Sequence, residues 1–122
     1  RELAERAHWP AIDVLASISR SMNDVAGADH QRTAERLRQV LSARKDADDL
    51  VSVGAYQHGA NPLVDTALRH ESEINGFLTQ QPAEICSLDE TLELMARVIR
   101  TLENDENDEA SEADEDRPRM AA

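Results

Sequence analysis

Residues 30–53, HQRTAERLRQVLSARKDADDLVSV, hold the longest helical pattern in this 122-residue chain. Apolar side chains recur there at spacings that put them on one face of a helix: Ala34, Leu37, Leu41 and Leu50. Asp29 stands where an N-cap belongs, and Gly54 can end the helix with a left-handed residue. The stretch therefore predicts one long helix from about His30 to Val53.

Downstream of that helix the pattern predicts a second one. Asn61 is placed to cap it, with Pro62 at the first position, where the missing amide costs nothing. Its expected inner face is made by small and branched apolar residues: Val64, Ala67 and Leu68. Another turn or two should lead to Pro82 and present three larger apolar residues: Ile74, Phe77 and Leu78.

A last helix is expected after residues 87–90, SLDE, which form a capping box. Its predicted inner face repeats at helical spacing: Leu88, Leu92, Met95 and Ile99. Aromatic residues make up only 2% of the chain, so the core should be small and rich in leucine. An antiparallel helical bundle over residues 28–102 is the natural arrangement.

The first 27 residues have another character. RELAERAHW, residues 1–9, reads as the end of a helix, which stops at Trp9 because a residue before proline avoids the helical region. AIDV, residues 11–14, predicts a short strand of a neighbouring sheet, and residues 17–28 predict a loop with room for one helical turn. We therefore divide the chain at residue 27.

The charge is unevenly distributed. The net charge is −12, and residues 103–122 contain nine acidic and two basic residues. This acidic, apolar-poor tail is expected to be disordered, either as a solubilising tail or as a partner-binding arm. An acidic body argues against non-specific nucleic-acid binding, which needs a basic face.

Several chemical functions find no support in the residues. Lys45 is the single lysine and has no preceding glycine, so the chain holds no phosphate loop of the GxxxxGK[ST] kind. The four histidines form no i, i+4 pair and have no cysteine partner, so no metal site is expected. One cysteine, Cys86, cannot form an internal disulfide and favours a reducing cytoplasm. No apolar run reaches the length of a membrane span.

Two segments resemble a known family. Residues 8–20, HWPAIDVLASISR, resemble the YPAxDxxxSxSR segment near the end of the nucleotide-binding domain in the rotary ATPase superfamily, to which the ATP synthase alpha and beta subunits belong. Residues 48–80, DDLVSVGAYQHGANPLVDTALRHESEINGFLTQ, are similar to the C-terminal helical domain of flagellar and type III secretion export ATPases. The resemblance covers about residues 1–100. It implies a mainly α fold, in which a helical bundle follows the last helix, strand and loop of a P-loop domain.

The resemblance also implies roles for individual residues. Arg20 occupies the position of an arginine finger, which projects toward the nucleotide of a neighbouring subunit; the alternative is a surface arginine in a weak ion pair. Trp9 matches a tyrosine that stacks on adenine, and its alternative is packing against Pro10 and the bundle. Phe77 matches a second adenine-contacting aromatic, although a core-facing position is the favoured interpretation because Ile74 and Leu78 share its face.

The family resemblance further implies partners. Tyr56, Gln57 and His58 match the loop that meets a central stalk in rotary enzymes; an ordinary solvated loop is the alternative. We expect a homo-oligomer, a hexamer by family, that contacts a stalk-like coiled-coil protein and export substrates or chaperones. It would be cytoplasmic and peripheral at the inner face of the bacterial membrane. ATP and Mg²⁺ would be held mainly by a part absent from this sequence, so this chain alone should not hydrolyse ATP.

Two other interpretations remain open at this stage. One is a non-catalytic helical interaction module from a truncated gene. The other is a fragment of an ATP synthase-type catalytic subunit, which residues 54–59, GAYQHG, disfavour because that family places an acidic loop there.

Overall fold

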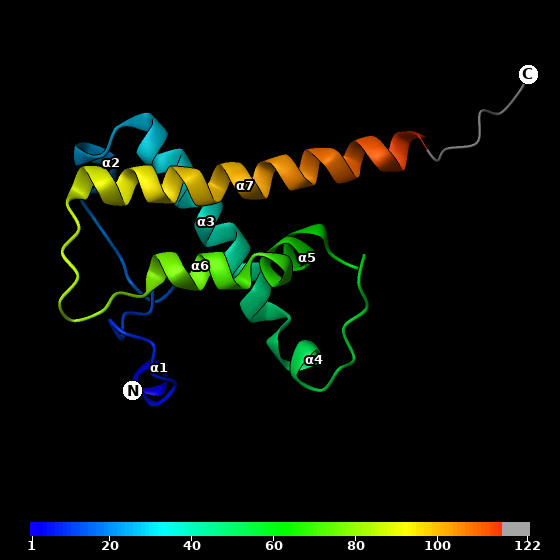
Figure 1. Cartoon of the computed structure of the whole chain (residues 1–122), viewed down its shortest axis with the longest axis horizontal. Helices are drawn as coiled ribbons and strands as arrows, with labels where there is room; N and C mark the ends of the chain where they lie inside the picture. Colours follow the sequence, from blue (N-terminus) through cyan, green and yellow to red (C-terminus); the bar gives the residue numbers. More distant parts are fainter. Residues whose placement is uncertain (116–122) are drawn as a thin grey trace, which may run out of the picture.

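A computed structural model describes the backbone of residues 1–115 and the side chains of residues 1–111. Within that range the regular structure is helical (Figure 1): α1 Glu2–Glu5, α2 Met22–Val25, α3 Ala28–Asp46, α4 Asp48–Ser52, α5 Pro62–Arg69, α6 Glu71–Leu78 and α7 Leu88–Glu115. The predicted mainly α class is confirmed.

The bundle is built around α3 and α7. α3 packs against α5 and α7, and the short helices α5 and α6 both pack against α7. In Figure 1 the α4–α5 loop and the α6–α7 loop lie at opposite ends of the bundle. One apolar cluster fills the space between these helices: Leu37, Val40, Ala67, Ile74, Met95, Ile99 and Leu102. Burying such side chains supplies most of the stability that a bundle of this size can have.

The predicted helix over 30–53 is two helices. Gly27, rather than Asp29, is the N-cap of α3, and the helix breaks at Ala47 before α4. Aspartates beside the break explain it, because carboxylates are unfavourable at the negative end of α3 and favourable in the first turn of α4. Gly54 follows α4 with φ +69°, so its predicted left-handed conformation is confirmed.

The two other predicted helix starts are also confirmed. The Asn61 side chain accepts a hydrogen bond of 3.0 Å from the Leu63 amide, and Pro62 is the first residue of α5. At α7 the Ser87 amide donates to Glu90 Oε2 at 2.8 Å, and the Glu90 amide donates to Ser87 Oγ at 3.2 Å. Leu88 departs from its predicted inner position and is exposed, because it precedes the turn of α7 that reaches the core.

The prediction of a disordered tail from Glu103 is wrong for residues 103–115, which continue α7 as helix. Tertiary partners explain the difference, since three of these acidic side chains find cations or polar groups on other helices. Glu106 pairs with Arg36 and accepts from the Thr66 hydroxyl, Asp105 lies 2.7 Å from His70 Nε2, and Glu109 pairs with Arg69. Residues 116–122 of the predicted tail lie outside the described residues.

The predicted strand over residues 11–14 is absent, and no strand occurs anywhere in residues 1–115. A strand needs a neighbour to pair its amides and carbonyls, and this part of the chain offers none. The segment instead runs without regular structure from α1 to a turn near Asp13. Just before it, the Trp9 carbonyl accepts a backbone hydrogen bond from the Gln80 amide, which lies beyond the end of α6.

Candidate functional site: the arginine segment and the inter-helix loop

Asp13 shapes the segment that leads to Arg20. Its carboxylate accepts hydrogen bonds from the amides of Leu15 and Ala16 at 3.0 and 3.1 Å, while its carbonyl accepts from the Ser17 hydroxyl at 2.6 Å. An aspartate side chain that bonds the amides just ahead of it makes a local turn without help from elsewhere. The turn ends three residues before Arg20.

Arg20 is exposed, and it makes no hydrogen bond or ion pair with the side chains and backbone described here. Its guanidinium therefore has its donors available at the surface. This placement is compatible with both predicted roles, the finger and the surface arginine, so the role of Arg20 stays a prediction.

Two side chains of α3 hold the segment on either side of Arg20. Arg38 Nη1 donates to the carbonyls of Val14 and Ser17 at 3.3 and 3.4 Å. Gln31 Nε2 donates to the carbonyl of Ala26 at 2.6 Å. Sequence reasoning missed both contacts, because a residue on a helix face carries no signal of which distant carbonyl it will meet. Asp13 did carry a signal, since Ser17 follows it at the spacing of a turn.

The two aromatic candidates occupy different environments. The Trp9 ring is exposed, and the Trp9 carbonyl accepts a hydrogen bond of 2.7 Å from the Gln80 amide, just beyond the end of α6. Phe77 is half-buried and packs against the core cluster. It also lines a cavity of about 740 Å³ with Ser17 and Ile18, a cavity that Trp9 does not line. The structure thus brings the backbone of Trp9 near α6 but does not place the two rings in one pocket.

The loop between α4 and α5 is held closed from within. Tyr56 donates to Asp65 Oδ1 at 2.8 Å, and the Gly59 amide donates to the other carboxylate oxygen at 2.9 Å. Asp65 is buried, and this pair of bonds satisfies it. Burial and the hydrogen bond to Asp65 raise the pKa of the Tyr56 phenol above its ordinary value of 10.0. The loop therefore has a defined conformation, and sequence reasoning missed that Asp65 fixes it.

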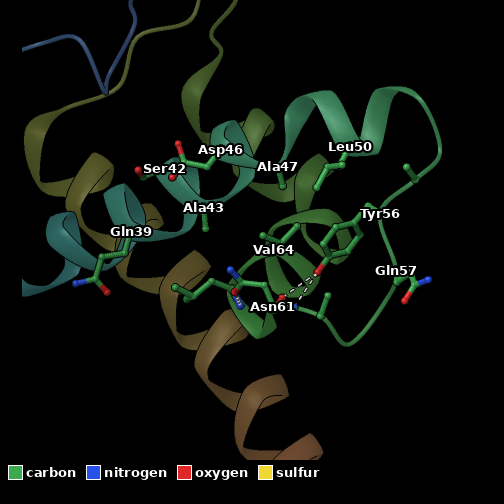
Figure 2. A pocket seen from close by; sticks show the side chains of 13 residues that line it. Gln39, Ser42, Ala43, Asp46, Ala47, Leu50, Tyr56, Gln57, Asn61 and Val64 are labelled. Atoms are coloured by element: carbon green, nitrogen blue, oxygen red, sulfur yellow. Dashed lines mark hydrogen bonds between the residues drawn. The ribbon is translucent and has the colours of Figure 1, made fainter.

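Of the three predicted loop residues, only two are free to meet a partner. Tyr56 uses its hydroxyl inside the loop, whereas Gln57 and His58 are exposed. Figure 2 shows the Tyr56 hydroxyl directed at Asn61 and the Gln57 side chain directed away from that contact. Tyr56, Gln57 and Leu50 line a groove of about 740 Å³ between α3, α4 and α5.

The described residues contain no group of three or more His, Cys, Asp or Glu side chains placed to hold a metal ion. Among the helices of residues 1–115, none is long and apolar enough to cross a membrane.

The fold and the site define an α-helical bundle domain that carries an exposed arginine segment at its N-terminal side. Comparison with known proteins identifies the family. Residues 26–97 match the family model described as the T3SS EscN ATPase C-terminal domain. The chain therefore belongs to the family of type III secretion ATPase C-terminal domains.

Curated relatives agree with this assignment. The chain is 49% identical over 102 residues to a type 3 secretion system ATPase of Pseudomonas syringae pv. tomato, covering 84% of this chain and 23% of that protein. It is 38% identical over 101 residues to a flagellum-specific ATP synthase of Caulobacter vibrioides, covering 83% of this chain and 23% of that protein. The chain thus spans about a quarter of the length of these relatives.

Solved structures agree as well. The assembled ATPase EscN of the enteropathogenic E. coli type III secretion system matches with a TM-score of 0.76 and 34% identity, covering 81% of this chain and 24% of EscN. EscN in complex with its central stalk EscO matches with the same TM-score and coverage.

Proposed function

We propose that the chain is the C-terminal portion of an ATP-hydrolysing protein export ATPase, and that Arg20 acts in trans on the nucleotide of a neighbouring subunit. The family assignment carries this proposal, together with the Arg20 guanidinium, which is exposed and has no partner among the described residues, three residues beyond the Asp13 turn. The relatives are named as ATPases, and EscN is described as assembled. Residues 1–27 would then belong to the nucleotide-binding domain and residues 28–102 to the helical domain.

The side chains of this portion fit a nucleotide only in part. The exposed Arg20 guanidinium suits phosphate oxygens, and the exposed Trp9 indole suits stacking on a base, whereas Phe77 has one side committed to the core. Bound ATP and Mg²⁺ would supply the reacting group, whose γ-phosphoryl is transferred to water. Arg20 contributes a planar, permanent charge that stabilises the negative charge spread over the transferring group.

The test is the ATPase rate of the full-length gene product as a function of protein concentration, for wild type and Arg20→Ala. We expect the wild-type rate to rise steeply with concentration, because the finger needs a neighbour. We expect Arg20→Ala to lose at least about tenfold in rate, or ~1.4 kcal/mol of barrier, with nucleotide binding and assembly intact.

Two controls accompany this test. Arg97→Ala changes another exposed arginine, on α7, and should keep the wild-type rate. The 122-residue chain alone, which lacks a phosphate loop, should not turn over ATP. An unchanged rate in Arg20→Ala would contradict the finger and leave Arg20 as a surface arginine in a structural turn.

We further propose that the α4–α5 loop faces a stalk-like coiled-coil protein. The support is the closed conformation of the loop, which leaves Gln57 and His58 exposed, and the stalk complex of the similar EscN. Export substrates or their chaperones would contact other surfaces of the bundle, and the ATPase would be cytoplasmic and peripheral at the inner face of the membrane. Fractionation of cells into cytosol and membranes tests that location, and pull-down with the full-length ATPase tests the substrate contacts.

The stalk contact is tested by the affinity of the full-length ATPase for its coiled-coil stalk protein. Gln57→Ala combined with His58→Ala should weaken binding by about tenfold, the effect of losing a few rim contacts. Gln81→Ala is the matched control, because it changes the same residue type in the exposed α6–α7 loop at the opposite end of the bundle (Figure 1). Equal affinities for the two variants would contradict the assignment of this loop.

A further inference from the structure

Arg38 differs from the other arginines of α3 in what it binds. Three of the four pair with carboxylates: Arg32 with Asp29, Arg36 with Glu106, and Arg44 with Asp48 and Glu71. Arg38 pairs with no carboxylate among the described side chains and donates only to the main-chain carbonyls of Val14 and Ser17. A guanidinium directed at two carbonyls holds a stretch of backbone in place rather than balancing a charge.

The segment that Arg38 holds has little else to fix it to the bundle. None of residues 11–20 is buried, and Ile18 is 88% exposed. A cavity of about 740 Å³ lies between residues 14–23 and the helices, so apolar packing does not fill the space beneath the segment. Among the described residues, the hydrogen bonds that join residues 11–20 to the helices of the bundle are the two donated by Arg38.

The other end of this contact is rigid. Leu37 and Val40, on either side of Arg38 in α3, are 4% and 0% exposed and belong to the core cluster. The backbone of α3 at Arg38 cannot move without moving the bundle, because packed cores resist local displacement. Any shift of the helical domain is thus passed to the Val14 and Ser17 carbonyls, which lie six and three residues before Arg20.

We infer that Arg38 is a positioning residue for Arg20, and that it couples the position of the helical domain to the arginine finger. This inference rests on the proposed function of Arg20. Its physical basis is that a reacting group displaced by about 1 Å can lose up to two orders of magnitude in rate. In this way a movement of a domain that meets a stalk would affect the chemistry of the neighbouring subunit, with Arg38 as one of the side chains that transmit it.

The first test uses the steady-state kinetics of the full-length ATPase. Arg38→Ala should lower kcat by about five- to tenfold and leave KM within about twofold, since the finger acts on the transition state. Arg38→Lys can still donate to both carbonyls and should recover most of the lost rate. Arg32→Ala, an exposed arginine on the same helix, should keep the wild-type kcat. Equal kcat in wild type and Arg38→Ala would overturn the inference.

A double-mutant comparison separates positioning from a general loss of structure. In the Arg20→Ala background, Arg38→Ala should cause no further loss of kcat, because the finger it positions is gone. A loss that multiplies with that of Arg20→Ala would overturn the inference. If Arg20→Ala alone keeps the wild-type rate, the proposed finger fails. If Arg20→Ala loses rate and Arg38→Ala does not, only the positioning role fails.

A readout independent of activity is hydrogen exchange of the full-length protein. Amides of residues 11–20 should exchange faster in Arg38→Ala than in wild type or Arg32→Ala, while those of α5 should be unchanged. Unchanged exchange over residues 11–20 in Arg38→Ala would overturn the inference, because Arg38 would then not hold the segment.

Discussion

The N-terminal segment, residues 1–27, and the bundle that follows it are stabilised in different ways. The described buried side chains all lie at residue 37 or beyond, whereas the segment has none and leaves apolar residues exposed: Trp9, Ile12, Ile18 and Val25. The bundle is therefore held by apolar burial, and the segment by short-range turns and by polar contacts with α3. The arginine segment therefore contacts the bundle through polar groups and contributes little to the stability of the bundle.

The largest test of this comparison removes one apolar side chain from each region. Leu102 is completely buried in the core cluster, so Leu102→Ala should lower the free energy of unfolding by about 2–5 kcal/mol. Ile18→Ala, in the exposed segment, should change it by less than about 0.5 kcal/mol. Denaturant unfolding followed by circular dichroism measures both. Similar losses in the two variants would mean that the segment is part of the cooperative core.

A second test concerns the acidic part of α7. Glu106 is half-buried against Arg36 and the Thr66 hydroxyl, so Glu106→Ala should cost about 1–2 kcal/mol of unfolding free energy. Glu103→Ala changes an exposed glutamate one turn earlier and should cost less than about 0.5 kcal/mol. Denaturant midpoints of the two variants provide the measurement. An equal loss of unfolding free energy in the two variants would mean that Glu106 behaves as a solvated surface charge.

The smallest effect on stability is expected at the capping box of α7, where the bundle is held by short-range hydrogen bonds like those of residues 1–27. The Ser87 amide and hydroxyl, which bond Glu90, hold the pKa of its carboxyl below the ordinary value of 4.5. A lowered pKa adds stability that is fully present above 4.5 and is lost as the pH falls through the pKa of the folded state. Wild type should melt slightly above Glu90→Gln near neutral pH, and the gap should close in acid. A gap that persists at low pH would contradict the capping box.

These bonds differ in how far the sequence could predict them. The two helix caps, at Asn61 and Ser87, join residues a few positions apart, and the left-handed conformation of Gly54 depends on that residue alone. The local sequence was therefore sufficient to predict all three. The prediction of disorder over residues 103–115 was wrong because Glu106 pairs with Arg36. The two residues lie seventy positions apart, so the local sequence carries no sign of the pair. The composition of such a segment shows only that it is acidic, and it does not indicate that arginine side chains of other helices will pair with its carboxylates.

The residues of the candidate site also differ in how far the sequence could predict them. Motifs were enough to find Arg20 and the loop of Tyr56, Gln57 and His58, because a family resemblance is carried by short stretches of consecutive residues. Asp65 closing that loop and Arg38 holding the arginine segment were not found, since each depends on which face of a helix meets which backbone. Whether Arg20 reaches a nucleotide remains the prediction that the kinetics must test.

By itself the sequence determined the helical class, the starts of α5 and α7 and the family, because helical periodicity, capping and motif spacing are local properties of the chain. Only the tertiary structure decided that α3 breaks at Ala47, that α7 extends to Glu115, and that Arg38 lies under the arginine segment. The physical reason is that these features depend on contacts between residues distant in the chain, whose free energy exists only once the bundle has brought them together.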